Sequence, residues 1–82
     1  MIPKIKNIEI ADDYKLIVSF DDGFRVCYDV KEDIDAIEDF KGLEQIYGLW
    51  QQAKLDSSRT CVYWNDSIDL ASDTVYEYGR PL

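Results

Sequence analysis

The sequence predicts an α+β fold: a three-stranded antiparallel meander, one or two short helices, a second β-hairpin and a short C-terminal helix. Three observations predict it. Near the N-terminus, two runs of alternating apolar and polar residues flank an Asp-Asp-Gly turn, which is the pattern of a β-hairpin. The apolar spacing then becomes helical, and after Gly48 it returns to alternation. Finally, 46% hydrophobic content in 82 residues is enough for the core of a single domain, spanning residues 1–82.

Two loop lengths are possible in the first hairpin, and they differ in which side chains lie opposite each other. A three-residue loop, Asp21–Gly23, pairs apolar residues across the strands, with Phe20 opposite Phe24. A two-residue loop would place Phe20 opposite Arg25 and bring a charge onto the core face, because a slip of one residue exchanges the faces. We therefore expect the three-residue loop, with its glycine in the left-handed conformation that disfavours a side chain.

The elements on either side of this hairpin complete the first half of the chain. Lys4–Ala11 alternates in the same way and predicts the first strand of the meander. Lys31–Asp39 and Leu43–Tyr47 carry apolar residues at helical spacing, and Gly42 between them favours two short helices over one. The side chains expected to cover the apolar face of the meander are Ile34, Ile37, Phe40 and Leu43, with Ile46 and Tyr47 continuing the stripe.

A second hairpin is expected from Gln51–Leu55 and Thr60–Trp64, which flank a four-residue polar loop. In this register Ala53 lies opposite Val62, and the same face carries Trp64 into the core. This segment is therefore predicted to form the second β-hairpin of the domain.

The C-terminal region is predicted to end in a helix. Ile68–Leu70 is expected to be a short extended segment. Ser72 is expected to cap a helical turn, which Gly79 ends and Pro81 prevents from resuming.

Charge and hydropathy exclude two kinds of partner. Seventeen acidic and nine basic residues give a net charge of −8, whereas phosphate binding needs clustered basic side chains, so direct nucleic-acid binding is not expected. No apolar run approaches the roughly 18–20 residues of a membrane span, and no signal peptide is evident. We expect a cytoplasmic protein whose two cysteines, Cys27 and Cys61, are reduced and half-buried.

The sequence contains no set of residues typical of catalysis or metal binding. It has no histidine, which removes the usual neutral-pH base and His-based metal sites. The two cysteines supply at most two zinc ligands. Asp66, Asp69 and Asp73 do not match the spacing of a calcium loop, and turn formation explains the first two. No catalytic, cofactor-binding or metal-binding residue is therefore predicted, and the protein is not expected to be an enzyme.

A partner-binding surface is the more promising kind of site. The run Asp29–Asp39 contains six acids against Lys31, which predicts either a solvated helix face or a docking site for a basic protein. Exposed aromatic residues would add anchors, although core packing explains them as well. The candidate partner-binding residues are Glu32, Asp35, Glu38, Asp39, Trp50 and Tyr63. The mixed face of the meander either stays in water or pairs with a second copy as a homodimer.

Several short motifs together resemble a bacterial family. They are, in chain order, Leu16-x-Val18-x-Phe20-x-Asp22-Gly23, Asp29, Phe40-x-x-Leu43, Trp64-x-x-x-Ile68-Asp69-Leu70 and Val75-Tyr76. Their order and spacing resemble the small family named domain of unknown function 2442, from about Ile5 to Gly79. The resemblance implies a compact α+β domain, no attached catalytic mechanism, and members that are suspected antitoxins or fusions with helix-turn-helix domains. Because the chain ends at Leu82, without room for such a domain, transcriptional autoregulation is not expected.

Two hypotheses for the function follow. The first is a non-enzymatic protein-binding or regulatory module, of which an antitoxin for a basic toxin is one form. The alternative is a small-ligand or cation-binding domain that uses the segment Trp64–Asp73. No cofactor is expected.

Overall fold

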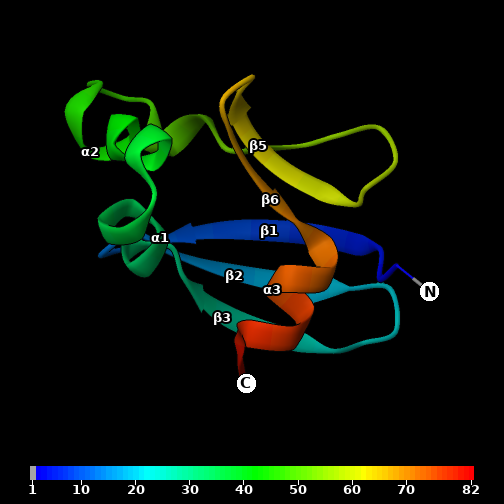
Figure 1. The fold of residues 1–82 in the computed structure, drawn as a ribbon. Helices are drawn as coiled ribbons and strands as arrows, with labels where there is room; N and C mark the ends of the chain where they lie inside the picture. The colour runs from blue at the N-terminus through cyan, green and yellow to red at the C-terminus, as the bar shows by residue number, and fades with distance from the viewer. Residues whose placement is uncertain (1) are drawn as a thin grey trace.

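The described residues of this computed structural model, 2–82, form two antiparallel sheets (Figure 1). Across the first sheet the strands are β1 (Ile5–Ala11), β2 (Lys15–Phe20), β3 (Arg25–Asp29) and β7 (Arg80–Pro81). Across the second they are β4 (Lys54–Leu55), β5 (Cys61–Asn65) and β6 (Ile68–Ala71). The helices are α1 (Lys31–Ala36), α2 (Gly42–Gln45) and α3 (Ser72–Tyr78), with 3₁₀ turns η1 (Glu38–Lys41) and η2 (Trp50–Gln52). The predicted α+β class is confirmed.

The first hairpin, β2–β3, has the predicted register and turn. Val18 pairs with Val26, and the loop closes where the N–H of Phe20 donates to the carbonyl of Phe24 at 2.9 Å. Gly23 has a φ of +89°, the left-handed conformation expected of it. Alternation places one face of this hairpin in the core and leaves the other half-buried.

The predicted first strand is β1, which pairs with β2 and carries a bulge near its start. The register shifts between Ile5 and Asn7, so that Ile5 pairs with Phe20 and is fully buried. The N–H of Ile5 donates to the carbonyl of Arg59 at 2.8 Å, which joins the first sheet to the loop of the second hairpin.

The second hairpin, β4–β5, differs in register from the prediction. Leu55 pairs with Val62, where the sequence predicted Ala53, and Gln51 lies in the 3₁₀ turn η2 instead of a strand. The cause is Asp56, whose carboxylate accepts two backbone N–H groups at the end of the loop, at 3.0 and 3.1 Å. This side chain holds a longer loop than the sequence pattern indicated. The shift is two residues, so the predicted core face is kept.

β6 adds a third strand to this hairpin. The extended segment predicted at residues 68–70 pairs with β5, and Leu70 lies opposite Val62. Both side chains point into the core.

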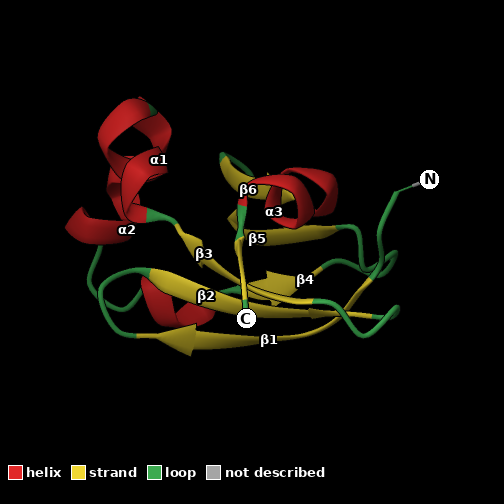
Figure 2. Ribbon diagram, turned by 90° about the horizontal axis from the view of Figure 1, so that it is seen from below, coloured by secondary structure: helices red, strands yellow, loops and turns green. Residues whose placement is uncertain are grey.

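The helical region covers the apolar face of the first sheet with fewer residues than predicted. Figure 2 shows α1 and α3 on the same side of that sheet. The predicted cover residues that are buried are Ile34, Phe40 and Leu43. Ile37 is 44% exposed because α1 ends there in an extended conformation, and Ile46 and Tyr47 are exposed because α2 ends before them. The predicted apolar stripe is wrong at these three positions.

Helix α3 ends as predicted but begins differently. Ala71 is its N-cap residue, and the Ser72 hydroxyl is buried without a hydrogen-bond partner, so the predicted Ser72 cap is wrong. The helix ends at Gly79, where a β-carbon would lie 2.7 Å from the Val26 side chain. The close approach of α3 to β3 therefore requires a glycine at this position. Beyond it, β7 pairs with β3.

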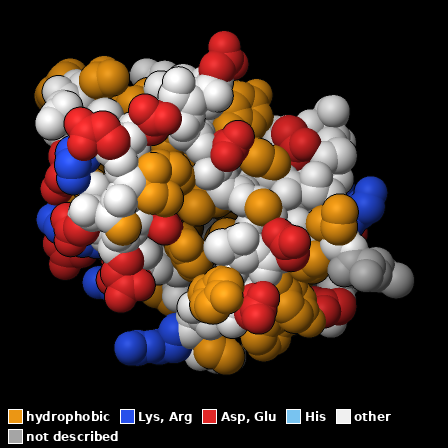
Figure 3. All heavy atoms as spheres, viewed as in Figure 1, with side chains coloured by type: hydrophobic (Ala, Val, Ile, Leu, Met, Phe, Trp, Pro, Cys, Tyr) orange, Lys and Arg blue, Asp and Glu red, His pale blue; other side chains and the backbone are white. Residues whose placement is uncertain are grey.

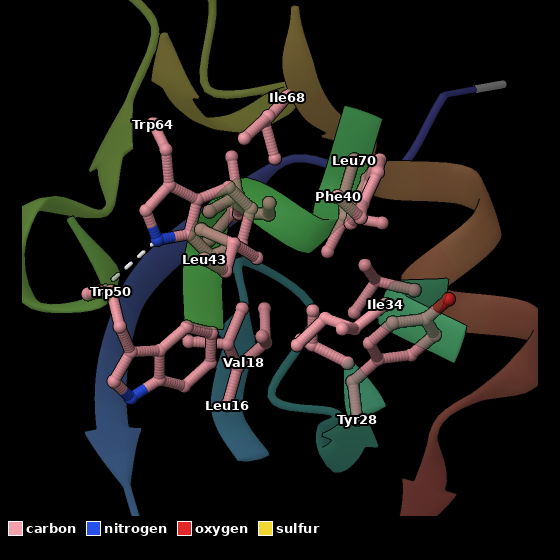
Figure 4. Packing of buried hydrophobic residues seen from close by; sticks show 14 of the residues in the cluster. Leu16, Val18, Tyr28, Ile34, Phe40, Leu43, Trp50, Trp64, Ile68 and Leu70 are labelled. Carbon is pink, nitrogen blue, oxygen red and sulfur yellow. Dashed lines mark hydrogen bonds between the residues drawn. The ribbon is translucent and has the colours of Figure 1, made fainter. Parts of the chain in front are cut away.

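The core is a single cluster that joins the two sheets and the helical region (Figure 4). Trp64 is buried within it, as predicted, and its indole N–H donates to the carbonyl of Trp50 at 3.1 Å. The two indole rings stack with centroids 5.6 Å apart. The core thus depends on residues from both halves of the chain.

Candidate protein-binding surface

Four of the candidate residues form an exposed acidic surface on α1 and η1. Glu32 and Asp35 lie on α1, and Glu38 and Asp39 begin η1. All four are exposed, because Ile34 and Phe40 take the inward-facing positions of these short helices. Figure 3 shows acidic side chains, with a few basic ones, on the side of the molecule where α1 and α2 lie. We refer to these four residues as the acidic face.

The two lysines of this region are engaged elsewhere. The ammonium of Lys31 lies 3.2 Å from the Glu44 carboxylate, and this hydrogen bond raises the pKa of Lys31. Lys41 donates to the backbone carbonyl of Ile34 at 3.0 Å. Among residues 2–82 the ion pairs are Lys31–Glu44 and Arg59–Asp21, so none joins the acidic face. Its four carboxylates are available to an external cation.

The two aromatic candidates lie apart from the acidic face. Trp50 is only 8% exposed, because its ring packs on Trp64 and against the edge of Tyr14. It therefore serves first as a core residue. Tyr63 is half-buried on β5, where alternation turns it away from its inward-facing neighbours Val62 and Trp64.

A groove beside Tyr14 and Trp50 was missed in the sequence. Two adjoining hollows of about 460 and 510 Å³ share these two residues. The first is also lined by Asp12 and Asp13, and the second by residues of α2 and the turn after it. We call them together the Tyr14–Trp50 groove. The sequence did not indicate it because Ile46 and Tyr47, which line its second hollow, were predicted to continue the apolar stripe that covers the meander.

Tyr14 itself is held in an unusual conformation. It has a φ of +58°, and the preceding Asp13 has a φ of +61°, so two successive residues other than glycine are left-handed. The carbonyl of Tyr14 accepts the N–H of Val30 at 2.9 Å, and its ring lies 5.1 Å from that of Trp50. The Lys31 ammonium lies 5.5 Å from the centre of the Tyr14 ring, within reach of a cation–π contact.

Comparison with known proteins assigns the chain to a family. Residues 5–81 match the family described as protein of unknown function, DUF2442. The chain belongs to the DUF2442 family. The match spans nearly the whole chain and confirms the resemblance seen in the motifs. Searches of curated proteins and of solved structures found no significant match.

Two polar side chains of the segment Trp64–Asp73 in this DUF2442 protein bond to nearby backbone. In the segment Trp64–Asp73, the Asn65 side chain accepts the N–H of Ser67, and Asp73 accepts that of Thr74. Within residues 2–82 there is no group of three or more acidic or cysteine side chains placed to hold a metal ion. No observation in this segment therefore favours the alternative hypothesis of a cation-binding domain.

The two cysteines of the DUF2442 protein are not placed for nucleophilic chemistry. Cys27 and Cys61 are half-buried and free, and burial raises the pKa of the Cys61 thiol. A raised pKa keeps this thiol protonated and weakly nucleophilic at neutral pH. None of the helices found in residues 2–82 has the length and apolar character needed to cross a bilayer.

Proposed function

We propose that this DUF2442 protein is a non-enzymatic binding module that recognises a basic protein partner through its acidic face. The observation that carries the proposal is the state of the charges on α1 and η1. Four carboxylates are exposed there without an ion pair among residues 2–82, while the neighbouring lysines already have partners. A net charge of −8 adds long-range attraction for a cationic protein.

The acidic face also offers an apolar contact. Ile37 lies between the two acidic pairs and is 44% exposed. Exposed charges mainly increase the association rate and select the partner, whereas buried apolar anchors supply affinity. An exposed isoleucine within an acidic surface suits a partner that places basic side chains around an apolar one.

The narrower form of the proposal is an antitoxin that neutralises a basic toxin in the cytoplasm. It is supported by the charge of the chain and by its two free thiols. In this form, binding would cover a functional basic surface of the toxin. The form requires that the partner inhibits growth when it is produced alone.

Co-expression with the products of the genes that flank its own tests the proposal. We expect one product to co-purify with the protein, and its affinity, measured by titration calorimetry, to fall about tenfold or more in the variant E32Q/D35N/E38Q/D39N. The matched control D66N/D69N/D73N/E77Q removes the same number of exposed charges elsewhere and should bind within about twofold of the unmodified protein.

Two outcomes would contradict the proposal. If both variants lose affinity for the partner to the same extent, net charge, and not the acidic face, determines binding. If no flanking product binds or inhibits growth, the antitoxin form fails.

A further inference from the structure

We propose that the Tyr14–Trp50 groove is the docking site for an apolar segment of the partner that carries a lysine or arginine next to its apolar anchor. This inference rests on the proposed function and adds the second surface through which the partner is held. The groove lies next to the start of α1, because Lys31 contacts both the Tyr14 ring and the Glu44 carboxylate of α2, and Glu32 of the acidic face follows Lys31 in this helix. One partner can therefore reach both surfaces.

The groove carries more exposed apolar surface than stability requires. Tyr47 is fully exposed, Ile46 is 54% exposed and Ile10 is 40% exposed, and all three line its two hollows. Single exposed apolar residues are common, but a group gathered around two adjoining hollows indicates an interaction site. Tyrosine in particular supplies large contact area at a low cost in side-chain entropy.

The backbone of the groove is strained at the residue that shapes it. A left-handed conformation is disfavoured for tyrosine, and glycine or asparagine would fit the same turn with less strain. What the tyrosine adds is a ring at the junction of the two hollows, against Trp50. Strain of this kind is concentrated at functional sites. The conformation of Tyr14 is thus explained by the surface that it builds.

Charge decides which occupant the groove fits. Asp12 and Asp13 line the first hollow and have no ion pair within residues 2–82, whereas Glu44, which lines the second, is paired with Lys31. A second copy of this chain would bring the same carboxylates face to face, and its own net charge is −8. A basic side chain placed among carboxylates and aromatic rings gains attraction from both. The occupant is therefore a basic and apolar segment of another protein.

Selection from a random dodecapeptide display library against the full chain tests the inference. We expect the enriched peptides to combine a basic residue with a neighbouring aromatic or aliphatic one. On titration, a selected synthetic peptide should change the tryptophan fluorescence, because Trp50 lines both hollows. In NMR spectra it should shift the amide signals of Tyr14, Ile46 and Tyr47.

Variants at exposed positions separate docking from folding. Tyr47→Ala should weaken the binding of the selected peptide about tenfold, because it removes an apolar anchor. D12N/D13N should weaken binding by a similar factor, because it removes two carboxylates that attract the basic residue of the peptide. The matched control is Tyr78→Ala, which removes an exposed tyrosine from α3 and should leave the affinity within about twofold. Thermal melts should show all three variants folded.

Several results would overturn the inference. These are a library without enriched binders, enriched peptides that lack basic residues, and equal binding to the Tyr47→Ala variant. A dimer in sedimentation velocity that Tyr47→Ala dissociates would overturn it as well, since a second copy would then fill the groove. The quadruple variant E32Q/D35N/E38Q/D39N and the variant Tyr47→Ala separate this inference from the proposed function. If the first no longer binds the protein partner but the second binds it normally, this inference fails while the proposed function stands.

Discussion

The first hairpin, β2–β3, and the second, β4–β5, are built from similar alternating sequences, but different contacts fix their registers. The first has five paired positions and a three-residue loop closed by its own backbone and by Asp22, which accepts the N–H of Phe24. The second has two paired positions, and its loop depends on the Asp56 side chain. In a hairpin with many paired residues and a tight turn, the strands and the turn fix the register by themselves. A hairpin with two paired positions needs further contacts to fix it.

The second hairpin is also tied to the rest of the chain. Arg59, in its loop, donates to both carboxylate oxygens of Asp21 at 2.7 and 2.9 Å, and to the carbonyl of Ile5 at 3.2 Å. Asp21 belongs to the loop of the first hairpin, so the two loops are linked. Trp64 adds a bond to the backbone of Trp50. The position of the second hairpin thus follows from contacts far apart in the sequence.

The largest loss of stability is expected from Trp64→Phe, which tests whether the second hairpin depends on these distant contacts. The change leaves the buried carbonyl of Trp50 without its donor and removes part of the ring, which should lower the free energy of unfolding by about 2–3 kcal/mol. Urea denaturation followed by circular dichroism measures it.

The matched control is Trp50→Phe. It removes the same part of a stacked ring, but the Trp50 indole makes no hydrogen bond within residues 2–82. The free energy of unfolding should therefore fall by about half as much as in Trp64→Phe. Equal losses in the two variants would show that ring packing, and not the bond to the backbone, holds the second hairpin.

A smaller effect is expected from Gly23→Ala, which tests the local origin of the first register. Alanine at a φ of +89° should cost about 1 kcal/mol, and Gly23→Asn should cost less because asparagine tolerates the left-handed region better. Urea denaturation gives both values. A loss in the asparagine variant as large as in the alanine variant would contradict the assigned turn.

The smallest effect is expected from the pH dependence of stability that Asp56, in the loop of the second hairpin, contributes. The hydroxyl of Ser58, followed by backbone N–H groups, lowers the pKa of Asp56 in the folded state. A lowered pKa contributes stability above the unfolded value of about 3.9, and this contribution is lost as the pH falls through the folded value. The stability difference between the unmodified protein and Asp56→Asn should therefore shrink below about pH 4.

Denaturation with urea at pH 7, 4 and 2.5 measures this difference. Asp66→Asn is the control, since Asp66 is exposed and its side chain makes no hydrogen bond within residues 2–82. If the free energy of unfolding of Asp56→Asn differs from that of the unmodified protein by the same amount at all three pH values, the charge of Asp56 does not contribute to stability.

Much of the fold could be predicted, because alternation and turn residues are local signals. The meander, the order of the elements, the end of α3 at Gly79 and the burial of Trp64 were predicted correctly. The errors lie where the backbone is irregular: the loop held by Asp56, and the end of α1, where Ile37 is extended. Periodicity gives no information about such contacts.

The candidate surface was predictable only in part. The exposure of the acidic face could be predicted from the order of residues, since a run of acids on a short helix lies outside the core. The groove could not be found, because the exposure of Tyr47 follows from the early end of α2. Tyrosine and isoleucine near an apolar stripe look like core residues in any single sequence.

The sequence by itself determined the first hairpin, the acidic character of α1 and η1, and the family of this protein. These depend on side-chain alternation, charge and residue order, which need no knowledge of distant contacts. The tertiary structure alone decided the position of the second hairpin, the packing of Trp50 on Trp64, and the left-handed Tyr14 that forms the groove. The physical reason is that a two-residue strand and a strained turn are stabilised mainly by what packs against them.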